Sequence, residues 1–180
     1  MDKDKRRLIA EAGVFLALSI VLEYVTLFIP RLPQGGKIIS LGMIPLLIFA
    51  ILRGGIPGMM MGFAMGLLFY FLDPFFLHPL QYFLDYPLAF GLVGAAGFVA
   101  QKNKEWTYYL AILTGLFLRF LAHFASGVVF FKIYLPEGFK NIYLYSAAYN
   151  AAFIIPTAIV CILLVPYMVK RIFSLGNEYR

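Results

Sequence analysis

Long apolar stretches, separated by short polar segments, limit this chain to a narrow class of folds. Hydrophobic residues make up 62% of its 180 residues and charged residues only 13%, whereas soluble domains are about 45–50% apolar and about 25% charged. A helix needs about 20 residues to cross a ~30 Å hydrocarbon core, and the first stretch, 8–29, is long enough. The runs are continuous rather than alternating, which argues against a β-barrel. The pattern therefore predicts an all-α integral membrane protein.

Residues 1–180 are expected to form a single membrane domain, a bundle of six transmembrane helices. The predicted helices cover 8–29, 40–52, 56–72, 79–100, 106–131 and 143–169. The second is short, roughly 20 Å long as a helix, so we expect it to cross the membrane only partly or to pack inside the protein.

The distribution of basic residues predicts the orientation. Six helices place both termini on one side, and ten lysines and arginines fall on that side against four on the other, with Arg119 inside a helix. Cytoplasmic loops carry an excess of these residues. We therefore expect a multi-pass protein of the cell membrane with both termini in the cytoplasm. The net charge of +6 then reflects basic loops on the cytoplasmic side of the lipid bilayer rather than nucleic-acid binding.

One group of polar residues stands out in the apolar segments. Asp85 lies inside the predicted fourth helix, where an unpaired carboxylate costs about 2.5–3.5 kcal/mol or more and must face a cavity or a partner. The topology places Tyr86, His123, Tyr145 and Asn150 in the same outer layer. A carboxylate among aromatic rings suits a flat, cationic ligand bound in an outward-facing pocket. The alternative is that these groups only hydrogen-bond one another between helices.

Arg119 and His123 are four residues apart and share a helix face. Arg119 either anchors an acidic group of a ligand or forms a structural ion pair, with Glu23 or Asp85 as candidate partners. The stripe of Gly58, Gly62 and Gly66 in the third helix predicts close packing within the bundle.

Small residues also line the first helix at Ala10, Gly13 and Ala17. Such a stripe allows helices to approach closely. It serves either as a flat docking face for another membrane subunit or for packing inside the bundle.

The loop after the first helix contains Pro33, Gln34, Gly35 and Gly36. Proline stiffens it and glycine permits unusual backbone angles, so it is either a lid over the pocket or an ordinary connector. The chain carries no phosphate-binding GxxxxGK[ST], HExxH or GxSxG motif. Its two histidines are too sparse for a zinc site and its one cysteine gives no disulfide framework. We expect no cofactor, no metal and no enzymatic activity.

Several motifs together resemble the thiamine-specific S components (ThiT/YuaJ family) of energy-coupling factor transporters, across nearly the whole chain. They are LPQGG at 32–36, SLGMIP at 40–45, HPLQYFLDYPLAF at 78–90, RFLAHFASGVVFF at 119–131 and YLPEG…YSAAYN at 134–150. The resemblance implies a high-affinity thiamine-binding subunit. Such a subunit works with a transmembrane coupling protein and two cytoplasmic ATPases.

The resemblance also implies roles for individual residues. Asp85 stands at the acidic ligand position, and the other substrate-binding positions are Tyr86, His123, Tyr145 and Asn150, with Phe131 where some members carry tryptophan. The first outer loop would cover the ligand, and Ala10, Gly13 and Ala17 would face the coupling protein.

Other functions stay open at this stage. An S component for another vitamin, such as riboflavin, or for a thiamine precursor would share the same architecture. A membrane enzyme could use Asp85 and His123 as acid and base, and a structural or sensory membrane protein would have no small ligand at all.

Overall fold

The computed structural model describes residues 2–32, 36–102, 104–138 and 140–178. Over these residues the chain forms helices and loops, together with one isolated antiparallel bridge between Arg31 and Lys37. The elements are α1 (Lys3–Val25), η1 (Thr26–Phe28), α2 (Met43–Arg53), α3 (Gly55–Tyr70), α4 (Pro79–Phe83), η3 (Leu84–Leu88), α5 (Ala89–Val93), α6 (Ala96–Val99), α7 (Trp106–Phe130), η4 (Lys132–Tyr134) and α8 (Ile142–Glu178).

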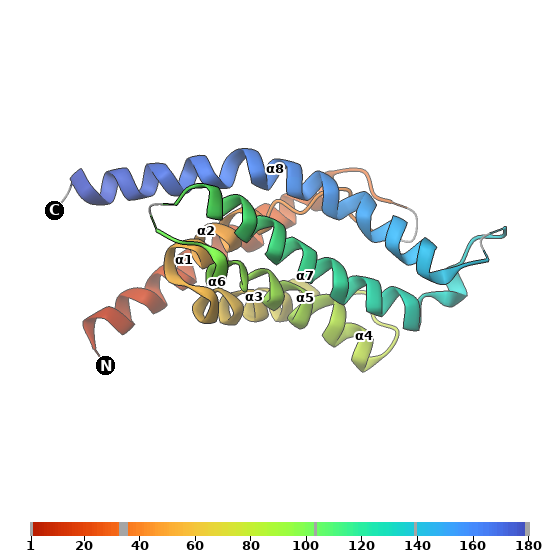
Figure 1. The fold of residues 1–180 in the computed structure, drawn as a ribbon. Helices are drawn as coiled ribbons and strands as arrows, with labels where there is room; N and C mark the ends of the chain where they lie inside the picture. Colours follow the sequence, from red (N-terminus) through yellow and green to blue (C-terminus); the bar gives the residue numbers. More distant parts are fainter. Residues whose placement is uncertain (1, 33–35, 103, 139, 179–180) are drawn as a thin grey trace.

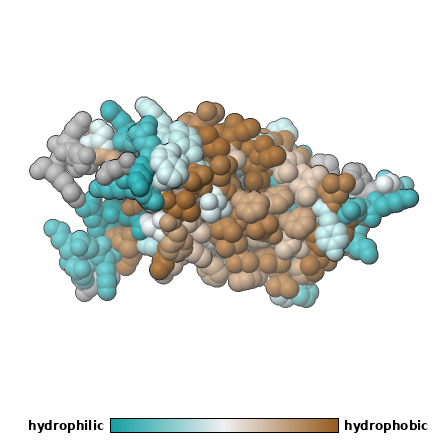
Figure 2. All heavy atoms as spheres, in the orientation of Figure 1, coloured by the Kyte–Doolittle hydropathy of each residue, from teal (hydrophilic) through white to brown (hydrophobic). Residues whose placement is uncertain are grey.

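Four helical segments of the described chain are long and apolar enough to cross a membrane. They are Lys3–Phe28, Pro79–Val99, Trp106–Phe130 and Ile142–Leu175. Figure 2 shows the matching surface, a broad hydrophobic band between two hydrophilic ends. The start of α1 and the end of α8 lie at one end of the bundle, and α4 lies at the other (Figure 1).

The second helix lies in the core. Every residue of α2 from Met43 to Ile51 is buried, as expected of a helix that is hydrophobic on all sides. At 11 residues and a rise of ~1.5 Å per residue, α2 is too short to span the bilayer alone. Of the two expectations for this segment, packing inside the protein is the one observed.

The glycine stripe of α3 packs against the helical segment formed by η3 and α5. A Cβ atom built on Gly62 would lie 2.2 Å from the carbonyl oxygen of Phe90, and one on Gly66 would lie 2.4 Å from that of Tyr86. Gly58 similarly leaves no room for a side chain. The stripe therefore serves internal packing, as predicted, because only hydrogen fits between the two backbones.

The single helix predicted at 79–100 is interrupted in the structure. Leu84–Leu88 forms a π-helical turn, and α5 and α6 follow as separate short helices. Pro87 explains the turn, because proline lacks the N–H that an α-helix would bond to the carbonyl of Phe83 and its ring clashes there. The wider turn contains Asp85, and such bulges occur frequently at functional sites.

Two helices extend beyond their predicted limits at the end that holds the termini. Helix α1 begins at Lys3 rather than at 8, and α8 continues to Glu178 rather than stopping at 169. Hydrophobicity marks where a helix leaves the membrane, but charged residues such as lysine and glutamate are good helix formers and continue it into water. A pair between Arg7 and Glu11, 3.0 Å apart, supports the first turns of α1.

Candidate functional site

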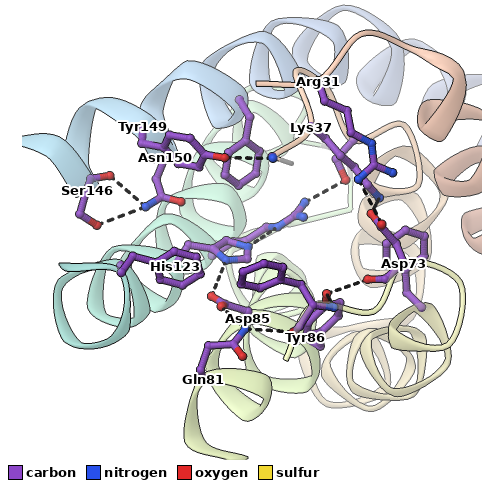
Figure 3. Close-up of a pocket in the computed structure, with 18 of the residues that line it drawn as sticks. Arg31, Lys37, Asp73, Gln81, Asp85, Tyr86, His123, Ser146, Tyr149 and Asn150 are labelled. Carbon is purple, nitrogen blue, oxygen red and sulfur yellow. Dashed lines mark hydrogen bonds and ion pairs between the residues drawn. The ribbon is translucent and has the colours of Figure 1, made fainter. Parts of the chain in front are cut away.

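A cavity of about 290 Å³ lies at the end of the bundle remote from the termini. Its walls come from the end of α1, the loops after η1 and α3, the α4–η3 segment, the second half of α7 and the start of α8 (Figure 3). The volume is at the low end of the range for small-molecule sites. The cavity is therefore large enough for a compact ligand.

All six residues predicted to bind the substrate line this cavity. They are Asp85, Tyr86, His123, Phe131, Tyr145 and Asn150. Gly36, from the predicted lid, lines it too, whereas Pro33, Gln34 and Gly35 fall outside the described residues. That these six residues bind a substrate stays a prediction, but the tertiary structure brings three distant parts of the sequence to one cavity.

Asp85 is the centre of a hydrogen-bond network in the cavity wall. Its Oδ2 accepts from Gln81 Nε2 at 2.7 Å and from the Ser126 hydroxyl at 2.8 Å, and its Oδ1 lies 3.0 Å from His123 Nδ1. Only 14% of the Asp85 side chain is exposed. The carboxylate is thus held rigidly by three donors, none of which is a lysine or arginine.

Arg119 connects this network to a second one. Its Nε–H donates to His123 Nε2 at 3.3 Å, and its Nη1 donates to the Ser40 hydroxyl at 3.0 Å. Glu23 and Asp85 were its predicted partners. Arg119 reaches Glu23 through Ser40 and Asp85 through His123, so it joins both acidic groups through intermediate side chains.

Glu23 has an ion-pair partner of its own. The buried carboxylate accepts from Lys37 Nζ at 2.8 Å and from the backbone N–H of Gly42 at 3.0 Å, and the Ser40 hydroxyl lies 2.8 Å from both its oxygens. The Lys37 ammonium also sits 3.6 Å above the Phe69 ring centre. Burial lowers the pKa of Lys37, and Glu23 partly offsets this effect.

Lys37 is a site residue that the sequence reasoning missed. It lies directly after the glycines of the first loop and carries no motif of its own. Its one signal was a lysine in an outer loop that otherwise has few charges, and this does not identify a partner 14 residues away.

Tyr86 supports the loop after α3. Its hydroxyl donates to the Asp73 carbonyl at 2.7 Å and accepts from the Phe75 N–H at 3.0 Å. Phe75 in turn stacks on Phe131, with ring centres 5.6 Å apart. The Asp73 carboxylate pairs with Arg31 at 3.1 Å. The aromatic edge of the cavity is therefore fixed by Tyr86 rather than formed by loose loop residues.

The first loop contacts α8 through a tyrosine that was also missed. The N–H of Gly36 donates to the Tyr149 hydroxyl at 2.9 Å, and a Cβ atom on Gly36 would lie 2.2 Å from that oxygen. One residue on, Asn150 uses its Nδ2 to donate to the Ser146 carbonyl at 2.9 Å. Glycine at position 36 thus permits a contact that any side chain would block.

The small residues of α1 lie outside the cavity, on the outer face of the bundle. Ala10, Gly13 and Ala17 are exposed, and a Cβ atom on Gly13 would meet nothing within 4 Å. Packing inside the bundle, one of the two predicted roles, is therefore wrong for this stripe.

No three His, Cys, Asp or Glu side chains in the described parts of the chain gather closely enough to hold a metal ion.

Comparison with known proteins places the chain in a family. A family model described as "Thiamine transporter protein (Thia_YuaJ)" matches residues 9–176. The thiamine transporter ThiT of Bacillus subtilis is 31% identical over 163 residues, which cover 84% of each protein. The thiamine transporter ThiT of Lacticaseibacillus paracasei is 34% identical over 158 residues, covering 79% of this chain and 76% of the relative.

A solved structure of ThiT from Listeria monocytogenes has the same fold. It aligns with a TM-score of 0.82 and 25% identity, over 94% of this chain and 96% of the other. These relatives are transport proteins rather than enzymes, so the alternative of an enzyme using Asp85 and His123 is set aside. Together with the apolar helices, the matches confirm the predicted family: the chain is a multi-pass membrane protein that belongs to the thiamine transporter (Thia_YuaJ) family.

Proposed function

We propose that this chain binds thiamine in the cavity and is the substrate-binding S component of an energy-coupling factor vitamin transporter. The observation that carries the proposal is the charge environment of Asp85. Two other carboxylates of the cavity have basic partners, Glu23 in Lys37 and Asp73 in Arg31. The hydrogen-bond donors to Asp85 are a glutamine, a serine and a histidine.

A buried negative charge without a positive partner is costly. The thiazolium ring of thiamine carries a fixed positive charge, so the bound vitamin supplies a positive partner that the hydrogen bonds from the described residues do not give Asp85. A carboxylate offers about four acceptor positions, and Asp85 uses three. The fourth position is available to the amine of the aminopyrimidine ring. One residue thereby recognises both the charge and a donor of the ligand.

Aromatic and polar groups fit the rest of the molecule. Phe131, stacked on Phe75, offers a ring face to a flat cation. Tyr145 and Asn150 line the α8 side of the cavity, where hydroxyl and amide groups suit the polar edge of a pyrimidine. The loop that contains Pro33, Gln34 and Gly35 is proposed to cover the ligand, because Gly36 attaches that loop to α8.

The cavity is proposed to face the outside of the plasma membrane. Both termini, at the opposite end, would be cytoplasmic, in agreement with the excess of basic residues there. Six helical segments would cross the membrane, with α2 and the loop before it making the second pass. The exposed Ala10, Gly13 and Ala17 would dock against the transmembrane coupling protein. Two cytoplasmic ATPases would supply the energy, because the chain has no phosphate-binding motif of its own.

Calorimetric titration of the detergent-purified protein with thiamine tests the proposal, with riboflavin as the control ligand. We expect tight one-to-one binding of thiamine and no binding of riboflavin. Asp85→Asn should weaken thiamine binding more than about tenfold, or about 1.4 kcal/mol, while Asp73→Asn, at a carboxylate with its own arginine, should have a smaller effect. Failure of folded wild-type protein to bind thiamine would refute the substrate assignment. Equal effects of the two substitutions would refute the role of Asp85.

A further inference from the structure

We infer that Arg119 is a positioning residue: it fixes the tautomer of His123 and thereby keeps this histidine an uncharged donor to the Asp85 carboxylate. The inference deepens the proposed function, on which its ligand-binding part rests. Arg119 lines the same cavity and thereby controls the charge beside Asp85 through His123.

The Arg119 guanidinium contacts the imidazole ring of His123 directly. A guanidinium group has five N–H donors, no acceptor, and does not lose its proton in proteins. The Nε of Arg119 lies 3.3 Å from Nε2 of His123, so this contact is a hydrogen bond only if Nε2 accepts. An accepting ring nitrogen carries no hydrogen. Arg119 therefore requires an unprotonated Nε2.

The other nitrogen of the His123 ring faces Asp85. A neutral histidine without a hydrogen on Nε2 carries it on Nδ1. That nitrogen lies 3.0 Å from Oδ1 of Asp85, so it donates to the carboxylate. His123 is thus a neutral donor that orients Asp85. It is not the cation that would neutralise it.

A doubly protonated His123 ring is disfavoured beside Arg119. An imidazolium would point a second N–H from Nε2 directly at the N–H of Arg119, and its charge would lie beside the guanidinium. Arg119 has little freedom to withdraw, because it is 4% exposed, bonded to Ser40 and stacked 4.6 Å from the Phe90 ring centre. On the α8 side, the ring of His123 makes a T-shaped contact with the uncharged ring of Phe153.

Arg119 thereby has a role in the preference of the site for charged ligands. If His123 carried a positive charge, Asp85 would already have a counter-ion and a cationic ligand would gain less from it. With His123 neutral, the ligand's own charge completes the pair. Arg119 therefore favours a permanently cationic ligand over an uncharged one of the same shape.

The chain allows a direct spectroscopic test, because it contains only two histidines. The second, His78, caps α4 by accepting from the Leu80 N–H, and His78→Asn should keep such a cap. Nitrogen NMR of ¹⁵N-histidine-labelled, ligand-free His78→Asn protein then reports only His123. A ring nitrogen without a hydrogen resonates well apart from one that carries it, so the tautomer is read directly.

Two substitutions separate tautomer control from simple packing. Arg119→Lys still presents only donors, so it should keep the hydrogen on Nδ1. Arg119→Gln presents both a donor and an acceptor, so it should admit the tautomer with hydrogen on Nε2. The ligand readout is the ratio of dissociation constants for thiamine and an uncharged analogue whose thiazolium is replaced by thiophene.

We expect the ligand-free His78→Asn protein to show hydrogen on Nδ1 alone. Arg119→Gln should show both tautomers and at least about a fivefold loss in preference for the charged ligand, whereas Arg119→Lys should keep tautomer and preference. A hydrogen on Nε2 without the Arg119 substitution would overturn the inference, and so would an Arg119→Gln variant with unchanged tautomer and preference. If Arg119→Gln does not fold, the spectra of the His78→Asn protein with and without Arg119→Lys still show which ring nitrogen of His123 carries the hydrogen. Absence of thiamine binding would refute the proposed function while leaving the spectra to judge Arg119.

Discussion

Removing the positive charge of Lys37 should be more damaging than removing the negative charge of its partner, Glu23. The two groups are 2.8 Å apart, but their surroundings differ. Glu23 is fully buried, whereas Lys37 is 12% exposed and has a second carboxylate, Asp73, at 4.0 Å. The asymmetry arises because Lys37 keeps a second carboxylate, Asp73, at 4.0 Å, whereas Arg119 reaches Glu23 only through the Ser40 hydroxyl.

The magnitudes follow from what each substitution leaves behind. Breaking a buried ion pair by removing one partner costs about 3–5 kcal/mol. Lys37→Met leaves the Glu23 carboxylate with neutral donors from Ser40 and Gly42, so we expect about 4 kcal/mol. Glu23→Gln leaves an ammonium that still reaches Asp73 and water, so we expect about 2 kcal/mol. Replacing both should cost less than Lys37→Met alone, since no unpaired charge remains.

Equilibrium unfolding in mixed detergent micelles, with helix content followed by circular dichroism, measures the free energy of unfolding. It is applied to the wild type, the two single variants and the double variant. Arg7→Met is a suitable control, because Arg7 forms an exposed pair with Glu11 that is worth roughly 0.2–0.5 kcal/mol. A double variant destabilised by the sum of the two single effects, or a Glu23→Gln variant less stable than Lys37→Met, would contradict this charge asymmetry.

Three further predictions use the same protein. Gly36→Ala should speed thiamine release several-fold, because its Cβ would lie 2.2 Å from the Tyr149 hydroxyl; an unchanged dissociation rate in stopped-flow fluorescence would contradict this. Gly13→Trp should keep thiamine binding but block co-purification with the coupling protein, whereas Ile159→Trp, at an exposed position of α8, should block neither; wild-type yield of the complex with Gly13→Trp would exclude the docking role. Burial lowers the pKa of Lys37, so the unfolded chain binds more protons than the folded chain between that lowered pKa and about 10.5. The free energy of unfolding should therefore rise with pH in this range, and Lys37→Met should lack this rise.

Much of the candidate site could be predicted because its residues are conspicuous in an apolar sequence. A carboxylate such as Asp85 cannot face lipid, so its presence in a membrane segment already indicates a cavity or a partner. His123 and Asn150 are unusual for the same reason. Counting helical rise from the segment ends was enough to place them in one layer, because the rise per residue of an α-helix is nearly constant.

The contacts that give the site its charge were beyond such reasoning. Lys37 pairs with Glu23 only because a loop folds back over the end of α1. Gly66 leaves room for the π-helical turn that holds Asp85, because a Cβ atom there would lie 2.4 Å from the Tyr86 carbonyl oxygen. Both contacts require two segments that are packed together, so residue spacing does not predict them.

The class of protein, the helical segments and the residues that must avoid lipid can be predicted from the sequence, because hydrophobicity, helix length and charge are properties of contiguous residues. The burial of α2, the exposure of the small residues of α1 and the pairing of donors with carboxylates become visible only in the folded chain. The physical reason is that a hydrogen bond needs its two atoms within about 3 Å. The distance between Asp85 and His123 is set by how η3 packs against α7, whereas Arg119 and His123, four residues apart, meet on one face of α7.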